Sequence, residues 1–179
     1  MNLVFIIALT FSVYIATTAF GIAKKNPWWR NMLYVCVLAV GQGLMYWLGS
    51  LLGGRFMHLF ENYSKIIVLI FCFMIAFRMV MDTLKIKSGK NLFLIDKPKE
   101  LIFLTIALGI NPFIAGLIAD AAFLPLYGNV TPLMIAGVAF VWGFIGCCTK
   151  FSPAKLLINS LLNIVAALAI LASGIIVLL

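Results

Sequence analysis

Six polar side chains stand inside long apolar runs, where a polar group needs a partner. They are Ser12, Tyr14, Gln42, Asn111, Asn159 and Asn163. Hydroxyl, phenol and amide groups can contact an ion or hydrogen-bond a small polar solute, and each can equally hydrogen-bond a neighbouring helix. Polar groups at this depth in a membrane protein usually face its interior or a water-filled cavity. We predict that these six residues line a substrate path.

Asn111 is followed by Pro112 in the segment GINPF, within the run LIFLTIALGINPFIAGLIADAAFLPL. Proline removes a backbone donor and disfavours helical geometry at the preceding residue. The pattern predicts a helix break at Pro112, with carbonyl groups near Leu108 freed to bind an ion or a polar solute. A packing kink that neighbouring helices patch is the alternative.

Three charged residues accompany these polar groups. Arg78 and Asp82 are four positions apart, so they share a helix face and are expected to pair while the arginine extends to the membrane edge. Asp120 follows Asn111 by nine residues and is expected near the outer mouth, at a cation entrance or as an interface residue. The identity of any bound metal stays unknown, because the four cysteines lie in apolar runs without CxxC spacing and His58 is the one histidine.

The composition indicates which elements position these residues. Apolar residues make up 65% of the 179, charged residues 10%, and the mean hydropathy is +1.18, far from a soluble domain. A helix needs about 20 apolar residues to cross the hydrocarbon, whereas barrel strands would alternate. We predict an all-α polytopic membrane protein with spans at about 2–23, 32–54, 66–84, 101–125, 131–149 and 156–178. The first run lacks a basic segment before it, so we expect a retained helix.

Lysine and arginine predict the orientation of the spans. They gather in the first, third and fifth connections, as in Lys24 and Lys25, in KIKSGKNLFLIDKPKE, and in Lys150 and Lys155. The positive-inside rule places these connections in the cytoplasm and both termini outside it. Most of the net charge of +8 is therefore explained by basic residues that set the orientation of the spans. We accordingly expect the lipid bilayer as a partner and no nucleic acid.

Six helices divide into two halves of three, which must face opposite ways across the membrane. We predict a single transmembrane domain over 1–179, with one repeat at about 1–85, a cytoplasmic connection at about 85–100 and a second, inverted repeat at about 101–179. A shift of 97 positions places Gly146 on Gly49 and Asn111 on Tyr14. Gly49 and Gly53 form a small-xxx-small pair with Met45 on the same face, for internal packing or for a homo-oligomer.

The chain has no phosphate-binding loop, dinucleotide glycine set, GxSxG or HExxH. We therefore expect no enzyme activity, no catalytic residue and no cofactor. Asp82 and Asp120 are expected on opposite sides of the bilayer, so they would not form one acid–base pair.

The chain resembles the manganese efflux pump (MntP) family of the lysine-exporter-like (LysE) superfamily of six-helix transporters. The resemblance covers most of the chain and is carried by AFRMVMDTLK, by VGQGLMYWLGSLLG with its glycine spacing, and by FSVYIATTAFGI and GINPFIAG. It implies an inverted repeat in the inner (plasma) membrane of a bacterium and export of a small cation, Mn²⁺ for the family, or of a small polar solute.

Three departures from the family are informative. The resemblance implies an aspartate at the position of Tyr14, a glutamate at Gln42 and an aspartate at Asn111, so all three membrane carboxylates are replaced. A divalent cation prefers oxygen ligands with formal negative charge. The alternative to a transporter is accordingly a transport-inactive homologue that serves as a membrane scaffold or accessory subunit.

Overall fold

In the computed structural model, the described residues, 2–22, 27–87, 98–119, 130–149 and 153–178, form helices and turns without a strand. The helices are α1 (Asn2–Ile22), α2 (Trp28–His58), α3 (Ser64–Lys87), α4 (Pro98–Leu117), α5 (Thr131–Cys148) and α6 (Pro153–Leu178), with the short 3-10 helix η1 (Glu61–Tyr63) before α3. Within these ranges, five helices are long and apolar enough to cross a membrane, and the apolar part of α1, Leu3–Thr18, is shorter. The predicted all-α polytopic membrane fold is confirmed.

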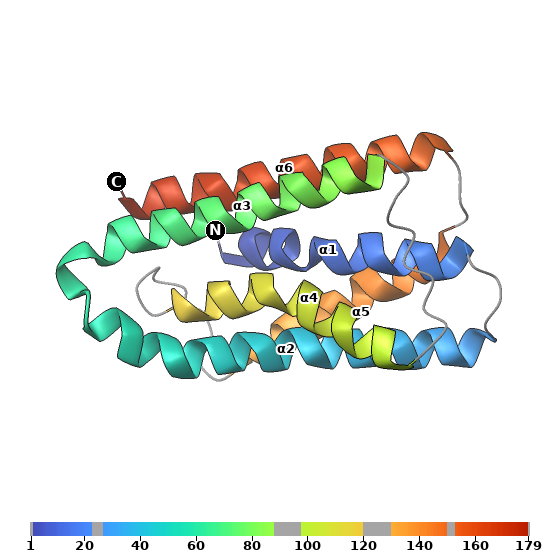
Figure 1. Ribbon diagram of the computed structural model, residues 1–179, viewed down its shortest axis with the longest axis horizontal. Coiled ribbons are helices and arrows are strands. Elements are labelled where there is room, and N and C mark those ends of the chain that lie inside the picture. Colours follow the sequence, from blue (N-terminus) through green and yellow to red (C-terminus); the bar gives the residue numbers. More distant parts are fainter. Residues whose placement is uncertain (1, 23–26, 88–97, 120–129, 150–152, 179) are drawn as a thin grey trace.

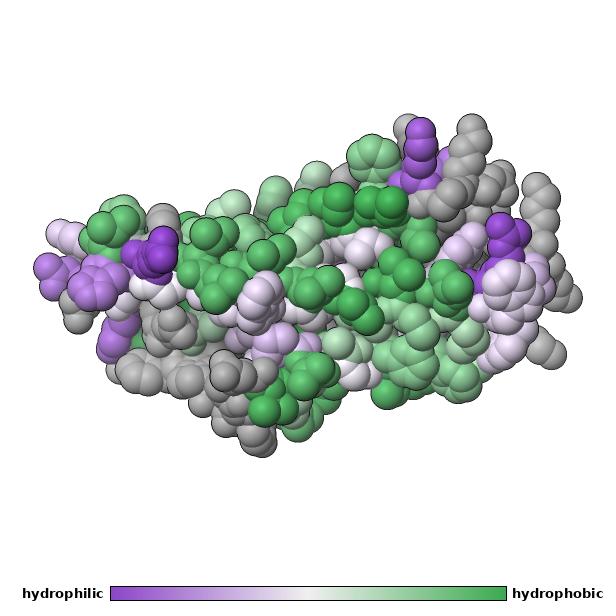
Figure 2. Space-filling view, turned by 90° about the horizontal axis from the view of Figure 1, so that it is seen from below, coloured by the Kyte–Doolittle hydropathy of each residue, from purple (hydrophilic) through white to green (hydrophobic). Residues whose placement is uncertain are grey.

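Apolar side chains cover the outside of the bundle where lipid would contact it. Figure 2 shows hydrophobic residues over the middle of one face and hydrophilic residues gathered toward its two ends. Trp28 and Trp29 are both exposed at the start of α2, directly before Arg30. Tryptophan favours the boundary between headgroups and hydrocarbon, so this end of α2 marks one membrane interface.

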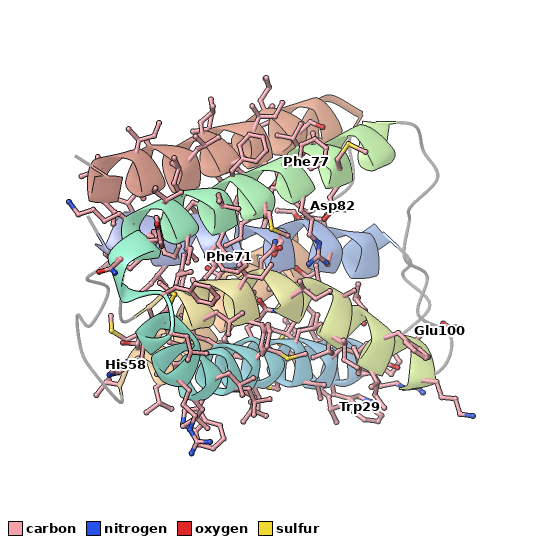
Figure 3. The ribbon with its side chains drawn as sticks, turned by 60° about the vertical axis from the view of Figure 1, so that its left-hand side comes forward. Trp29, His58, Phe71, Phe77, Asp82 and Glu100 are labelled. Atoms are coloured by element: carbon pink, nitrogen blue, oxygen red, sulfur yellow. The ribbon has the colours of Figure 1, made fainter. Side chains whose placement is uncertain are left out.

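The helices lie lengthwise in an elongated bundle and reverse direction from one to the next (Figure 1). The N- and C-terminal ends lie at the same end of the bundle. Trp29 and Glu100 lie at the opposite end, where α2 and α4 begin (Figure 3). Helices α1, α3 and α5 end on this second side, and α2, α4 and α6 begin there (Figure 1).

Helices α2 and α4 run parallel and touch along a seam of small residues, which we call the glycine seam. Its facing pairs are Gly41 with Thr105, Met45 with Gly109, Gly49 with Phe113, and Gly53 with Leu117. Each partner lies 64 positions later in the chain (105 minus 41, 117 minus 53). A Cβ on Gly49 would overlap the Phe113 carbonyl oxygen and lie 3.1 Å from the Gly116 Cα. The small-xxx-small pair of Gly49 and Gly53 therefore serves internal packing, which is one of the two roles that the sequence suggested for it.

The other helices pack in two groups. Helix α5 lies against α1 and α2, and α3 runs antiparallel to α6 along one edge of the bundle (Figure 1). A Cβ on Gly143 would lie 2.7 Å from Val35 Cγ1, and one on Gly146 would lie 2.8 Å from the Tyr14 carbonyl oxygen. Two of the glycines in α5 are thus required for close approach to α2 and α1.

The fourth span ends earlier than the apolar run predicts. Helix α4 stops at Leu117, and residues 118–119 form a turn in which the Ala119 N–H donates to the Gly116 carbonyl at 3.2 Å. This bond reaches back three residues instead of four, which tightens the chain out of α-helical geometry. The prediction that the span continues to 125 is wrong for residues 118–119, and 120–125 lie outside the described residues.

Two apolar clusters fill the interior, and polar residues interrupt them on three helices. One cluster includes Phe11 of α1, Tyr46 of α2 and Ala115 of α4; the other includes Val13, Ala39 and Leu104 of the same helices. On each helix a polar residue lies in the chain between the two contributions: Ser12 on α1, Gln42 on α2 and Asn111 on α4. On α2 and α4, Gln42 and Asn111 therefore lie in the chain between residues of the two clusters, whereas on α1 the two clusters interleave.

Candidate functional site

Arg78 joins α3 to α4 and is the centre of the candidate site. Its Nη1 donates to Asn111 Oδ1 at 3.3 Å, and its Nη2 donates to the Ala107 carbonyl oxygen. Arg78 is half-buried, Ala107 is exposed and Asn111 is only 2% exposed. The guanidinium therefore lies at the edge of the bundle, over a buried amide. The geometry differs from the expectation that Arg78 extends toward the membrane edge, because its hydrogen bonds draw it across to α4.

The charge at this position decides what can bind beside it. Both acceptors, an amide oxygen and a backbone carbonyl, are neutral, so neither cancels the charge of the guanidinium. Two unit charges 4 Å apart interact by about 4 kcal/mol at an effective dielectric of about 20. A divalent cation next to Arg78 would be repelled by about twice this amount. The same term would attract an anion.

Pro112 lies within α4 and does not end it. The helix is continuous from Pro98 to Leu117, so the predicted helix break is wrong. The proline still withholds an N–H from the carbonyl of Leu108, four residues earlier. Arg78 donates to the adjacent carbonyl, that of Ala107, so a neighbouring side chain supplies a donor near the proline. The carbonyl that Arg78 binds is thus the neighbour of the one that Pro112 leaves without its helical donor.

Asn163 of α6 hydrogen-bonds α3 at Met79, the residue after Arg78, and at Thr83. Its Nδ2 donates to the Met79 carbonyl at 2.9 Å and to Thr83 Oγ1 at 2.7 Å, while its buried Oδ1 has no hydrogen-bond partner. Thr83 in turn donates to the Met79 carbonyl at 2.9 Å. Helix α3 thus carries polar contacts to α4 through Arg78 and to α6 through Met79 and Thr83.

Gln42 is the most unusual buried residue in the described part of the chain. It is fully buried on α2, and neither its Oε1 nor its Nε2 has a hydrogen-bond partner there. A buried amide without partners costs about 1–3 kcal/mol. Such a cost indicates a group kept for binding, because Leu at this position would pack without the penalty.

Most buried hydroxyl groups on these helices are satisfied by their own helix. Thr10 donates to the Ile6 carbonyl at 2.8 Å, and Thr17 donates to the Val13 carbonyl at 2.9 Å. Ser12 differs, because its buried Oγ has no partner in the described structure. The structure therefore distinguishes Ser12 from the threonines beside it, which the sequence does not.

Tyr14 is half-buried among aromatic rings. Its ring centroid lies 5.3 Å from that of Phe11 and 5.7 Å from that of Trp142. Trp142 Nε1 is buried and has no partner among the described residues. Sequence reasoning missed Trp142, although a tryptophan in the middle of a span, away from the membrane interface, is itself a signal. It also missed Thr83, which follows Asp82 directly in the sequence.

The predicted path residues lie at different levels of the bundle. The 64-residue offset of the glycine seam makes Asn111 level with residue 47 of α2, roughly 7 Å along the axis from Gln42. The contacts of α5 with Val35 and Tyr14 place Tyr14 on the other side of Gln42, on the order of 10 Å away. Tyr14, Gln42 and Asn111 are therefore stacked along the bundle and do not form one cluster.

The remaining predicted residues are placed as follows. Asn159 is buried one turn before Asn163 on α6. Asp82 is half-buried on the side of α3 that faces the bundle (Figure 3), and it has an interaction partner of its own. Asp120 lies outside the described residues. Among the residues that the structure describes, no three His, Cys, Asp or Glu side chains form a group that could hold a metal ion.

The chain is similar to a protein of Bacteroides thetaiotaomicron that is named as a proposed manganese efflux pump, MntP. The two share 29% identity over 144 residues, which cover 78% of this chain and 74% of the relative. No protein-family model matches the chain. No solved structure matches it. Together with the apolar helices, the similarity to the Bacteroides protein supports a membrane transporter.

Proposed function

We propose that this chain is a transporter, not an enzyme, that exports a small ion or polar solute by alternating access through the bundle. The observation that carries the proposal is the unsatisfied buried amide of Gln42, which lies on α2 between residues of two apolar clusters. A polar group between two apolar regions can bind a solute while either region closes the path. Manganese is the solute in the relative's name, so it is the first to be measured.

We also propose that the bundle is an inverted repeat. In such a repeat, α1, α2 and α3 correspond to α4, α5 and α6. The packing of α1 against α5 then corresponds to the packing of α4 against α2, and both pairs are in contact. The contact between α3 and α6 corresponds to itself. Each of the two corresponding glycines faces the first helix of the other half. Gly146 faces the Tyr14 carbonyl and Thr17, and Gly49 faces the Phe113 carbonyl and Gly116. Such repeats place the binding site where the halves meet.

The proposed location is the inner membrane of a bacterium, with both termini outside the cytoplasm. This orientation follows from the lysine-rich connections, because both termini lie at the end of the bundle opposite to them. The exported solute would then enter from the end where Trp29 and Glu100 lie.

The test is the metal and solute content of cells that lack their own manganese exporter and express this chain. We expect expression to lower the content of at least one solute, and Asn111→Leu to reduce that effect at least tenfold. Thr10→Val is the matched control, since the Thr10 hydroxyl is bonded within its own helix. Each variant is compared at equal amounts in the membrane.

Two outcomes would contradict the proposal. If Asn111→Leu exported as well as the unmodified chain, the path would not pass Asn111. If expression changed no solute although the protein is folded in the membrane, the transport-inactive scaffold or accessory subunit would be the better interpretation, as the replaced carboxylates suggest.

A further inference from the structure

Arg78 is the most deeply placed charge in the described spans. Helices α1 and α5 contain no charged residue, and the charges of α2 and α4 lie near helix ends: Arg30, Arg55, Lys99 and Glu100. On α3, the Asp82 carboxylate lies one turn from Arg78, closer to the end of the helix, and it takes part in an interaction. The charge nearest to the buried Asn111 amide is therefore the guanidinium that binds it.

The two groups that accept hydrogen bonds from Arg78 are neutral, so they do not compensate its positive charge. A guanidinium has five N–H donors in a planar fork, and the two hydrogen bonds to α4 use two of them. The fork geometry matches carboxylate and similar anions, which accept two parallel hydrogen bonds. The oxygens of Asn111 and Ala107, which a cation would need, each accept a hydrogen bond from the positively charged guanidinium.

The buried groups without partners include both donors and acceptors. Gln42 Nε2 and Trp142 Nε1 are buried N–H donors without partners in the described structure. The Oε1 of Gln42 and the Oδ1 of Asn163 are unpartnered acceptors, so the neutral groups alone favour neither sign of charge. The full charge of Arg78 then outweighs the partial charges of the amides.

We propose that the Arg78–Asn111 site binds a small anion, and that the exported solute is of this class. This inference rests on the proposed transport function and narrows it. Asn111 holds the guanidinium in place through its Oδ1, and the remaining guanidinium N–H groups bind the anion. Donors farther along the bundle, such as the amide of Gln42, are available to it along the path.

The test is flux into proteoliposomes that contain the purified full chain. Chloride, acetate, inorganic phosphate and Mn²⁺ are each supplied alone, in phosphatidylcholine vesicles. We expect flux of at least one of the three anions and none of Mn²⁺. Arg78→Gln should lower the anion flux at least tenfold, whereas Arg78→Lys, which keeps the charge, should retain more flux than Arg78→Gln. Arg55→Gln, the same change at the end of α2, should stay within twofold of the unmodified chain.

A charge reversal sharpens the test. Asn111→Asp places a carboxylate against the guanidinium and should lower the anion flux at least tenfold, while Asn31→Asp, the same change near the start of α2, should have a smaller effect. If Arg78→Gln failed to fold, Asn111→Asp would still test the proposal, because it leaves Arg78 its partner and changes only the net charge of the site.

Three outcomes would overturn the anion proposal. Flux of Mn²⁺ without anion flux would contradict the anion proposal but would agree with the proposed transport function. Stabilisation by phosphatidylglycerol that depends on Arg78, without flux of any anion, would mean that the anion is a lipid headgroup and not a transported solute. The absence of flux for all four probes, with folded protein in the vesicles, would remove this inference, while the solute content of the expressing cells would decide separately on the transport function.

Discussion

Helix α4 contacts its neighbours in two different ways on its two sides. Toward α2 it meets the glycine seam, where backbone lies against backbone at Gly49 and Gly116. Toward α3 it is bridged by one long side chain, that of Arg78. Close backbone packing is the main source of helix association in a membrane, where no hydrophobic effect drives helices together. The glycine seam therefore joins α4 to α2 through backbone packing, whereas polar contacts of Arg78 join α4 to α3.

The contrast suggests how stability and function are divided. Changes in the glycine seam should affect folding first, because no side chain there can move aside. Changes at the polar residues should affect function first, because their hydrogen bonds contribute little to stability. Unfolding measurements on four variants, made on the purified protein in detergent, would break or sharpen this division.

Gly49→Ala should have the largest effect. The new Cβ would overlap the Phe113 carbonyl oxygen, which belongs to the backbone and cannot rotate away. Overpacking of this kind costs about 1–3 kcal/mol, and we expect a loss of about 2 kcal/mol in the free energy of unfolding. The measurement is a denaturant titration of the detergent-solubilised protein.

Gly137→Ala is the matched control for the seam. A Cβ on Gly137 would meet nothing within 4 Å, so the helix propensity of alanine should leave the protein unchanged or more stable by up to about 1 kcal/mol. Gly137 thus differs from Gly143 and Gly146 of the same helix, where a Cβ would meet a neighbouring helix. Equal losses for Gly49→Ala and Gly137→Ala would show that the seam has no special role.

Asn163→Leu should have a smaller effect. It removes the hydrogen bonds to the Met79 carbonyl and to Thr83 Oγ1 between α6 and α3. Hydrogen bonds between membrane helices average about 0.6 kcal/mol, so we expect a loss of about 1 kcal/mol. In a double-mutant cycle, Asn163→Leu should be non-additive with Thr83→Val and additive with Thr105→Val, whose hydroxyl donates within α4. Additivity in both cycles would contradict the contact.

The sequence predicts the helices well because membrane thickness fixes the length of a span. Six apolar runs became six helices in the described residues, with small differences at most ends. The exception, α4, ends through a local hydrogen bond between Ala119 and Gly116, and the number of apolar residues does not encode such a bond. Helix existence is thus readable from composition, whereas a helix end depends on single backbone contacts.

The sequence predicts the candidate site less completely. It selects Gln42, Asn111 and Asn163, all of which the structure buries, although their role in a substrate path stays a prediction. It does not give the partner of Arg78, because Asn111 is 33 positions away and the rotation of two helices decides whether they meet. Asp82 was the expected partner because it is the nearest carboxylate on the same helix face.

The relative positions of the helices along the bundle axis could not be predicted from the sequence either. Tyr14, Gln42 and Asn111 each stand near the middle of their own helix, and the sequence therefore suggests one common level. The structure separates them because the partners of each helix set its position along the bundle. The offset of 64 between α2 and α4 comes from where small residues allow the two backbones to touch, at Gly49 and Gly116.

Gln42→Leu should have the smallest effect on stability, with the opposite sign. Removing a buried amide without partners relieves its desolvation cost, and leucine has a similar volume, so we expect the free energy of unfolding to rise by up to about 1 kcal/mol. The exported solute should lose at least tenfold in flux in the same variant. A loss of stability greater than about 1 kcal/mol would instead mean that the Gln42 amide serves the fold. Gln42 would then stabilise the bundle as the glycine seam does. The division between residues for stability and residues for function, drawn from the two sides of α4, would not hold for α2.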